Sequence, residues 1–149
     1  MNLSLPNIIN SEISVLYPSP EKKKNSRFGY SVEALSIATL IQNQNKNLKY
    51  YDFSLSQYDE ILASDNFWKS GNSKNKIVFL YVDSVPLHRS SNAENATQIS
   101  ELIKRRCPET TIVACGPWCM LTQENFPFAD ITFFNEPEYD FLQMIQENE

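Results

Sequence analysis

Short apolar runs alternate along the chain with amphipathic stretches of helical periodicity. The runs are rich in β-branched and aromatic residues, which is typical of strands, and turn-forming residues separate them from the stretches that follow. This pattern predicts five strands, over residues 12–17, 48–55, 77–82, 110–115 and 131–134. Because strands that alternate with helices form βαβ units, we expect a parallel sheet with right-handed connections.

The predicted helices lie between these strands and after the last one. Ser31 suits the N-cap of the first helix, and Glu33 falls in its first turn, where the helix dipole favours a carboxylate. The cations Lys104, Arg105 and Arg106 close another helix, where the dipole favours positive charge. In all, helices are expected over residues 32–41, 58–64, 93–106, 121–126 and 138–147.

The run 77–82 is apolar without interruption, which a strand covered on both faces requires, so it is the predicted central strand. The flavodoxin-like order 2-1-3-4-5 needs five strands, which is the number predicted, so we favour this order. The sequence has no internal repeat and no long linker. We therefore expect a single α/β domain over residues 1–149, with helices on both faces of the sheet.

The net charge and hydropathy of the chain limit the kinds of partner and the cellular location that we expect. The 149 residues have a net charge of -5, which repels phosphate and argues against a nucleic-acid partner. The basic cluster at 22–24, with Arg27 after it, is short, and we interpret it as a solvated loop. No stretch approaches the roughly 20 apolar residues of a membrane span, and the first ten residues do not resemble a signal peptide. We expect a cytoplasmic protein that does not enter a membrane.

Cys107, Cys115 and Cys119 are an odd number of cysteines in a chain without a secretion signal, which indicates reduced thiols. Cys115 and Cys119 lie four positions apart, but no second pair completes a zinc site and no closely spaced third cysteine completes an iron–sulfur motif. We interpret all three as structural or incidental and expect no iron–sulfur cluster in this chain.

Ligands of open parallel sheets bind at the carboxyl ends of the strands, beside the point where the winding direction reverses. The candidate loops are residues 17–29, 83–92, 116–122 and 135–138. Gly29, Gly71 and Gly116 are the only glycines, and no Gly-rich phosphate-binding motif is present. His88 is the sole histidine, and no Gly-x-Ser-x-Gly elbow accompanies it. The sequence therefore predicts no catalytic constellation.

Four short motifs follow one another in the second half of the chain. They are Ile103-Lys104 with Pro108, Gly116-Pro117 with Thr122, Ala129-Asp130, and Asn135-Glu136-Pro137-Glu138. In order and spacing they resemble the cobalamin-binding-type domain found at the N-terminus of many radical S-adenosylmethionine enzymes. The first predicted strand, ending in Tyr17-Pro18, and the helix after Gly29-Tyr30 are similar to the first unit of that family.

The resemblance implies a cobalamin cofactor, held by the loops after the third, fourth and fifth strands. The implied binding residues are Ser84, Val85, His88, Gly116, Pro117, Trp118, Thr122, Asn135, Glu136 and Pro137. It also implies a radical S-adenosylmethionine enzyme or domain as partner, because the Cys-x3-Cys-x2-Cys motif of the radical-generating half is not in this sequence.

Three positions depart from the family pattern. Cys115, Trp118 and Asn135 stand where the family has glycine or other small residues that keep open the groove for the nucleotide tail. The Asp-x-His-x-x-Gly motif that supplies an axial histidine in another cobalamin group is absent as well. We therefore expect an accessory domain that either holds a corrinoid or is degenerate, with no catalytic activity by itself.

The sequence leaves two other functions open. A stand-alone protein-interaction module that has kept the fold and lost the cofactor would expose an apolar patch near Phe28, Tyr30 or Trp118. A small-molecule enzyme would depend on His88, Asp83 and the thiols.

Overall fold

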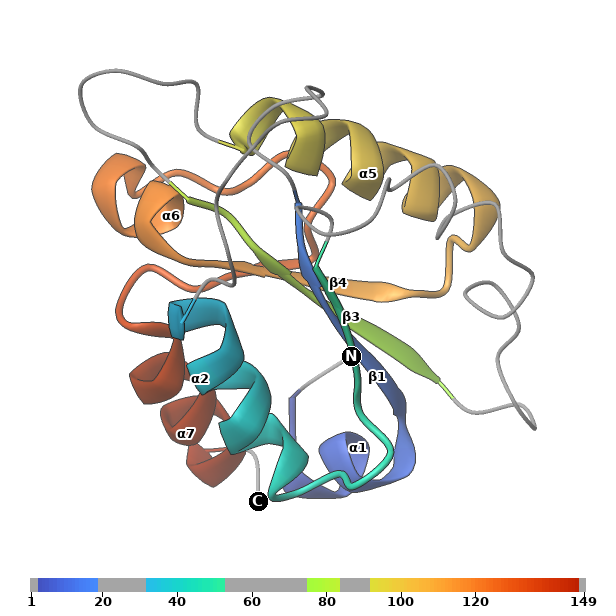
Figure 1. The fold of residues 1–149 in the computed structure, drawn as a ribbon. Coiled ribbons are helices and arrows are strands. Elements are labelled where there is room, and N and C mark those ends of the chain that lie inside the picture. The colour runs from blue at the N-terminus through green and yellow to red at the C-terminus, as the bar shows by residue number, and fades with distance from the viewer. Residues whose placement is uncertain (1–2, 19–31, 53–74, 84–91, 148–149) are drawn as a thin grey trace.

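The computed structural model describes residues 3–18, 32–52, 75–83 and 92–147. Its strands are β1 (Glu12–Tyr17), β2 (Lys49–Asp52), β3 (Lys76–Tyr81), β4 (Thr111–Cys115) and β5 (Ile131–Thr132). They form one sheet in the order β2-β1-β3-β4-β5, and every pair of neighbours is parallel (Figure 1). The predicted flavodoxin-like order is therefore confirmed.

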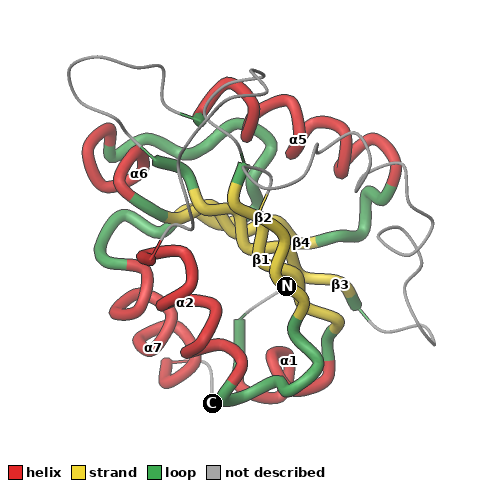
Figure 2. Tube along the Cα trace, in the orientation of Figure 1, coloured by secondary structure: helices red, strands yellow, loops and turns green. Residues whose placement is uncertain are grey.

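Helices cover both faces of the sheet (Figure 2). One face is covered by α1 (Leu5–Asn10), α2 (Val32–Gln42) and α7 (Pro137–Glu147), and the other by α5 (Ala93–Arg106) and α6 (Pro117–Thr122). Successive strand residues point to opposite faces, so each buried strand supplies side chains to two separate cores. In β3, Phe79 packs in the core beneath α2 and α7, whereas Leu80 packs in the core beneath α5.

The central position of β3 explains its uninterrupted apolar sequence. All six of its residues are buried, and it lies between β1 and β4. The Phe79 ring lies 6.4 Å from Phe133 and 6.0 Å from Phe141, which it meets edge to face. Contacts of this kind fasten the last strand and the last helix to the centre of the sheet.

Two short helices differ from the sequence prediction. The helix α1 was not predicted; the Ser4 hydroxyl caps it by accepting a hydrogen bond from the Asn7 N–H, and it buries Ile8. The prediction of a helix at 121–126 is wrong, because α6 begins at Pro117 and ends at Thr122. Proline is favoured at the first position of a helix, where its missing N–H costs nothing, so the Gly116-Pro117 pair starts the helix as well as ending the strand. Phe126 lies beyond α6, in the loop, and is buried.

The other predicted elements agree with the structure to within three residues where they are described. The predictions for β1 and α5 match their bounds, β4 and α7 differ by one residue at one end, and β3 lies one residue earlier than predicted at both ends. The described part of β2 ends at Asp52, and the helix predicted at 58–64 lies outside the described residues. Within the described ranges, no helix is long and apolar enough to cross a membrane.

Candidate functional site

The carboxyl ends of β1 and β3 meet at the point where the winding of the sheet reverses, which is where ligands of this fold class bind. Tyr17 is the last residue of β1, and Asp83 follows β3. The Tyr17 hydroxyl donates a hydrogen bond to Oδ2 of Asp83. The Tyr17 ring also lies 6.1 Å from the ring of Tyr81. The two strand ends are thus linked by side chains across the reversal point.

Asn92 fastens the same two strand ends through its side chain. That side chain is fully buried, and Nδ2 donates to the carbonyl oxygens of Pro18 at 2.9 Å and Tyr81 at 3.1 Å. Its Oδ1 accepts the backbone N–H of Asp83 at 2.7 Å. One amide therefore satisfies polar backbone groups after β1 and after β3, and it fixes where both loops leave the sheet.

Burial dominates the protonation of this cluster. It raises the pKa of the Asp83 carboxyl above its ordinary value, and the nearby Glu33 raises it further, while the Tyr17 hydrogen bond opposes the rise. Burial likewise raises the pKa of Tyr81, with a further increase from the charge of Asp83. A half-buried carboxyl with a raised pKa at a winding reversal can exchange a proton or bind a polar ligand group.

The turn after β4 lies against the end of β3. Gly116 has φ +112°, and a Cβ added there would lie 2.7 Å from the carbonyl oxygen of Val82, so only glycine fits. Two backbone hydrogen bonds hold this approach, from Val82 to the Cys115 carbonyl at 2.7 Å and from Trp118 to the Val82 carbonyl at 3.1 Å. Gly116 and Pro117 therefore lie at the carboxyl edge of the sheet, as the sequence predicts.

The side chains on either side of this turn are engaged within the protein. Cys115 is fully buried, and its thiol donates to the Leu80 carbonyl at 3.7 Å. The half-buried Trp118 meets Phe126 edge to face, with the ring centres 5.2 Å apart. Burial raises the pKa of Cys119 to about 12 and holds the pKa of Cys115 well above its usual range. Both thiols are therefore packing groups rather than nucleophiles.

The remaining predicted binding residues are spread over two helix ends. Thr122 is exposed at the end of α6, and its hydroxyl accepts the Glu124 N–H. Asn135 and Glu136 are exposed ahead of α7, whose first residue, Pro137, is buried. Ser84, Val85 and His88 lie outside the described residues.

Two of the motifs that carry the family resemblance meet at the amino end of β4. Lys104 of the Ile-Lys motif forms an ion pair of 2.6 Å with Asp130 of the Ala-Asp motif. Lys104 also donates to the Thr110 carbonyl, and Asp130 accepts the Ile112 N–H at 2.8 Å. These residues secure the connections of α5 and β5 to β4, so their role in this chain is structural.

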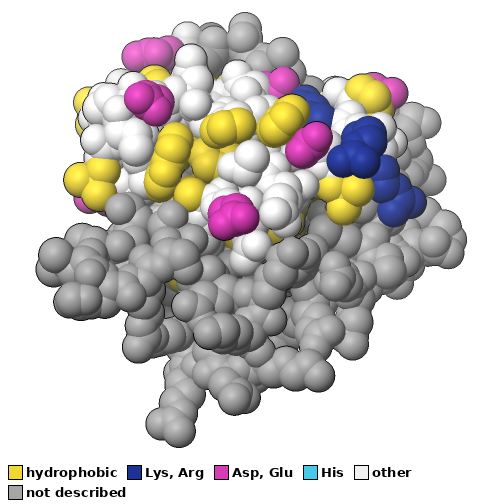
Figure 3. Space-filling view, turned by 90° about the horizontal axis from the view of Figure 1, so that it is seen from above, with side chains coloured by type: hydrophobic (Ala, Val, Ile, Leu, Met, Phe, Trp, Pro, Cys, Tyr) yellow, Lys and Arg dark blue, Asp and Glu magenta, His cyan; other side chains and the backbone are white. Residues whose placement is uncertain are grey.

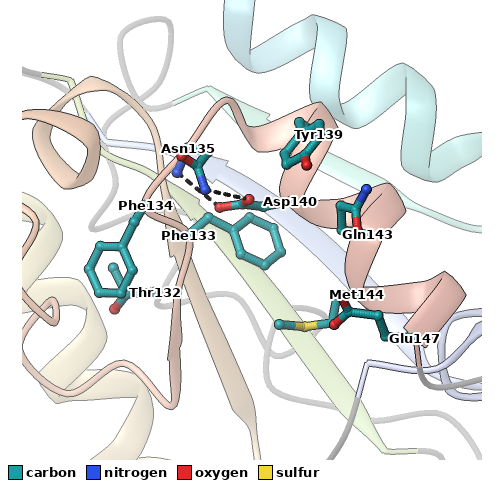
Figure 4. A pocket seen from close by; sticks show the side chains of 9 residues that line it. All are labelled: Thr132, Phe133, Phe134, Asn135, Tyr139, Asp140, Gln143, Met144 and Glu147. Carbon is teal, nitrogen blue, oxygen red and sulfur yellow. Dashed lines mark hydrogen bonds between the residues drawn. The ribbon is translucent and has the colours of Figure 1, made fainter.

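A groove opens between the last strand and the last helix, which we call the β5–α7 groove (Figure 4). It has a volume of ≈ 360 Å³ and is lined by Thr132, Phe133, Phe134, Asn135, Tyr139, Asp140, Gln143, Met144 and Glu147. At one end the Asp140 carboxylate accepts hydrogen bonds from the backbone N–H of Asn135 at 2.9 Å and from its side chain at 3.1 Å. Of the predicted binding residues that the structure describes, Asn135 alone lines this groove.

Tyr17 and Asn92 lie at the ends of two of the candidate loops, but the sequence did not single out either residue within its loop. The available signals were a tyrosine that ends a buried strand and an asparagine that precedes a helix. Either is common for packing or capping reasons alone, so neither signal identifies a link between the ends of β1 and β3.

No protein-family model matches the chain, and no curated protein or solved structure is significantly similar to it. The class of the protein is therefore defined by its fold, a doubly wound, flavodoxin-like α/β sheet with an acid–phenol pair at the winding reversal.

Proposed function

We propose that this chain is an accessory domain of the cobalamin-binding type that works beside a radical S-adenosylmethionine enzyme and holds no corrinoid itself. The main support is the position of the Gly116-Pro117 turn, at the carboxyl end of β4 and in contact with Val82. In a sheet of order 2-1-3-4-5, that edge is the binding edge of the fold. The order and spacing of the other motifs, which resemble those of the family, are a further support.

Three positions argue against a resident corrinoid. They are the ones where the resembled family has small residues and where this chain has Cys115, Trp118 and Asn135. Cys115 is buried against Leu80, Trp118 packs on Phe126, and Asn135 is bound to Asp140. The residues present therefore do not fit the nucleotide tail of a corrinoid, and we assign no cofactor chemistry to the chain.

An accessory domain of this kind contributes binding rather than chemistry. The partner enzyme generates the radical, and this chain contributes a rigid surface built on the sheet. The hydrogen bonds of Tyr17 and Asn92 stiffen the edge at which a functional cobalamin domain would open.

The cofactor half of the proposal is tested by anaerobic reconstitution of the full chain with hydroxocobalamin, followed by gel filtration. We expect no corrin absorbance to co-elute with protein at micromolar concentrations. Co-elution at one equivalent would overturn the statement that no corrinoid is held.

The partner half is tested by co-expression with the radical S-adenosylmethionine enzyme encoded nearest to this chain in its genome. We expect a 1:1 complex that survives gel filtration at micromolar concentration. Separate elution of the two proteins would overturn the accessory role.

A stand-alone interaction module is a second candidate, favoured by exposed apolar side chains on the α6 side. Leu121 is 68% exposed and Phe128 is 47% exposed, whereas the neighbouring Trp118 is half-buried. Figure 3 views the side covered by α5 and α6, where hydrophobic side chains lie among polar ones and the basic residues gather at one end. Phe28 and Tyr30 lie outside the described residues. This candidate predicts a stable complex with a protein that has no radical-generating domain, weakened by Leu121→Ser.

A further inference from the structure

The β5–α7 groove lies at an open border of the fold. β5 is the last strand in the sheet order, so no strand borders it on the groove side in the described part of the chain. The groove runs between β5 with the residues after it and the outward face of α7 (Figure 4). Its volume of ≈ 360 Å³ is in the range of built ligand sites. Its lining residues on α7 run from Tyr139 to Glu147, a span that an extended segment can follow.

The floor of the groove is apolar and fixed. Phe133 is almost fully buried and packs on Phe79, and Met144 packs partly against the same core. Tyr139, 57% exposed, and Phe134 stand on opposite sides of this floor. Aromatic side chains beside a flexible methionine form a surface on which an apolar anchor of a partner can pack.

The charge of the groove has one sign. Asp140 and Glu147 are the charged residues among those that line it, and both are acidic. They lie seven positions apart on α7, which places them ~10 Å apart along the helix axis. A segment in the extended polyproline II conformation covers that distance in about three residues, at roughly 3.1 Å per residue, and its side chains return to the same side every third residue. A complementary segment therefore has two basic side chains three positions apart, with apolar side chains between them.

We propose that the β5–α7 groove docks an extended segment of a partner protein in which two basic residues flank an apolar pair. The apolar side chain rests on Phe133 and Met144, and the basic side chains pair with Asp140 and Glu147. That this partner is the radical S-adenosylmethionine enzyme rests on the proposed function; the groove and its chemistry do not.

The groove is tested with two synthetic peptides and the full chain labelled at its methionine methyl groups. The peptides are acetyl-Lys-Leu-Phe-Lys-amide and the charge-reversed acetyl-Glu-Leu-Phe-Glu-amide. The chain has three methionines, and Met144→Leu assigns the Met144 signal. We expect the basic peptide to shift Met144 and to leave Met120, on α6, unmoved. The acidic peptide should bind at least tenfold more weakly. Equal binding of both peptides, or no shift of Met144, would overturn the proposal.

A pair of matched variants tests whether the preference for the basic peptide comes from charge in the groove. Glu147→Lys reverses a charge at one end of the groove, and Glu101→Lys makes the same change on α5, at the other face of the sheet. Both positions are exposed, so both variants should fold, as circular dichroism will verify. We expect Glu147→Lys to weaken the basic peptide at least fivefold and Glu101→Lys to change its affinity less than twofold. Equal effects of the two variants would refute specific docking.

The same variants distinguish a failure of the groove proposal from a failure of the proposed function. If the co-expressed enzyme binds the wild type and the Glu147→Lys variant equally well, the accessory role stands and the assignment of the groove to that enzyme fails. If the basic peptide shifts Met144 but the enzyme does not bind the chain, the groove stands and the proposed function fails.

Discussion

The phenol of Tyr17 donates a hydrogen bond to the carboxylate of Asp83, 66 residues further along the chain. The two residues follow from the ends of β1 and β3, the strands between which the winding of the sheet reverses. In a doubly wound fold this is where a ligand crevice opens, and here side chains of the protein join its two sides. Asn92 strengthens the link by bonding the backbone after both strands.

Replacing Asp83 with asparagine should change how stability depends on pH. Because burial raises the pKa of Asp83, the folded state holds this proton more tightly than the unfolded state does, and stability is lost as pH rises from the ordinary value of 3.8 through the raised pKa. An amide cannot ionise, so the Asp83→Asn variant should gain stability relative to the wild type across that window and keep a constant difference above it. Urea unfolding between pH 3 and pH 8 measures this difference. If the variant instead becomes less stable relative to the wild type as pH rises, the Tyr17 hydrogen bond outweighs burial in setting the pKa of Asp83.

Asn92→Ala should be the most destabilising polar substitution at this edge. It removes three hydrogen bonds of 2.7–3.1 Å and leaves buried backbone groups without partners. The expected loss is about 3 kcal/mol of unfolding free energy, measured by urea denaturation. Asn43→Ala, at an exposed position after α2, is the control and should cost less than about 0.5 kcal/mol. Equal losses would contradict a linking role for Asn92.

Gly116→Ala should destabilise the chain through its backbone. The new Cβ would meet the Val82 carbonyl at 2.7 Å, and alanine would have to adopt φ +112°. Strain of this kind costs about 2 kcal/mol or more, which corresponds to a loss of about 4–8 °C in Tm. Calorimetry of Pro117→Ala gives the comparison at the neighbouring position, where a smaller loss is expected because any residue can begin a helix. A Gly116→Ala variant as stable as the wild type would show that this turn has room to move.

The thiols should differ sharply in reactivity. Cys115 and Cys119 are buried with raised pKa values, whereas Cys107 is partly exposed. At pH 8 the native chain should react with Ellman's reagent at a single thiol, and the urea-unfolded chain at all three of its cysteines. Cys107→Ser should abolish the native reaction. Rapid native modification of a second thiol would contradict the burial of Cys115 and Cys119.

If the chain descends from a cobalamin-binding domain, smaller side chains in the turn after β4 should improve corrinoid binding. The double variant Cys115→Gly and Trp118→Ala restores small residues at two positions where the resembled family has them. Since these side chains are packed in the wild type, we expect a stability loss of about 3–5 kcal/mol together with at least tenfold tighter binding of hydroxocobalamin. Equilibrium dialysis measures the affinity, and Leu102→Ala on α5 controls for general loosening of the core against which Trp118 packs. Unchanged affinity in the double variant would count against descent from a cobalamin-binding domain.

Much of the fold follows from periodicity alone. The continuous apolar run in β3 identified the central strand, and the apolar positions of α5 with its closing cations gave that helix its bounds. Short elements were less predictable. The helix α1 has six residues and little apolar periodicity, and α6 was displaced because Pro117 was interpreted only as the end of a strand.

The sequence by itself determined the strands and the turn at Gly116-Pro117, because hydrophobic periodicity and turn chemistry are local properties of the chain. The parallel order followed from the few topologies open to alternating strands and helices. Only the tertiary structure decided that Tyr17, Asp83 and Asn92 bond to one another, and that β5 and α7 leave a groove with acidic residues along it. These contacts join segments dozens of residues apart or depend on how a helix is rotated on a sheet. Their existence is set by the packing of the two cores, which no short stretch of sequence specifies.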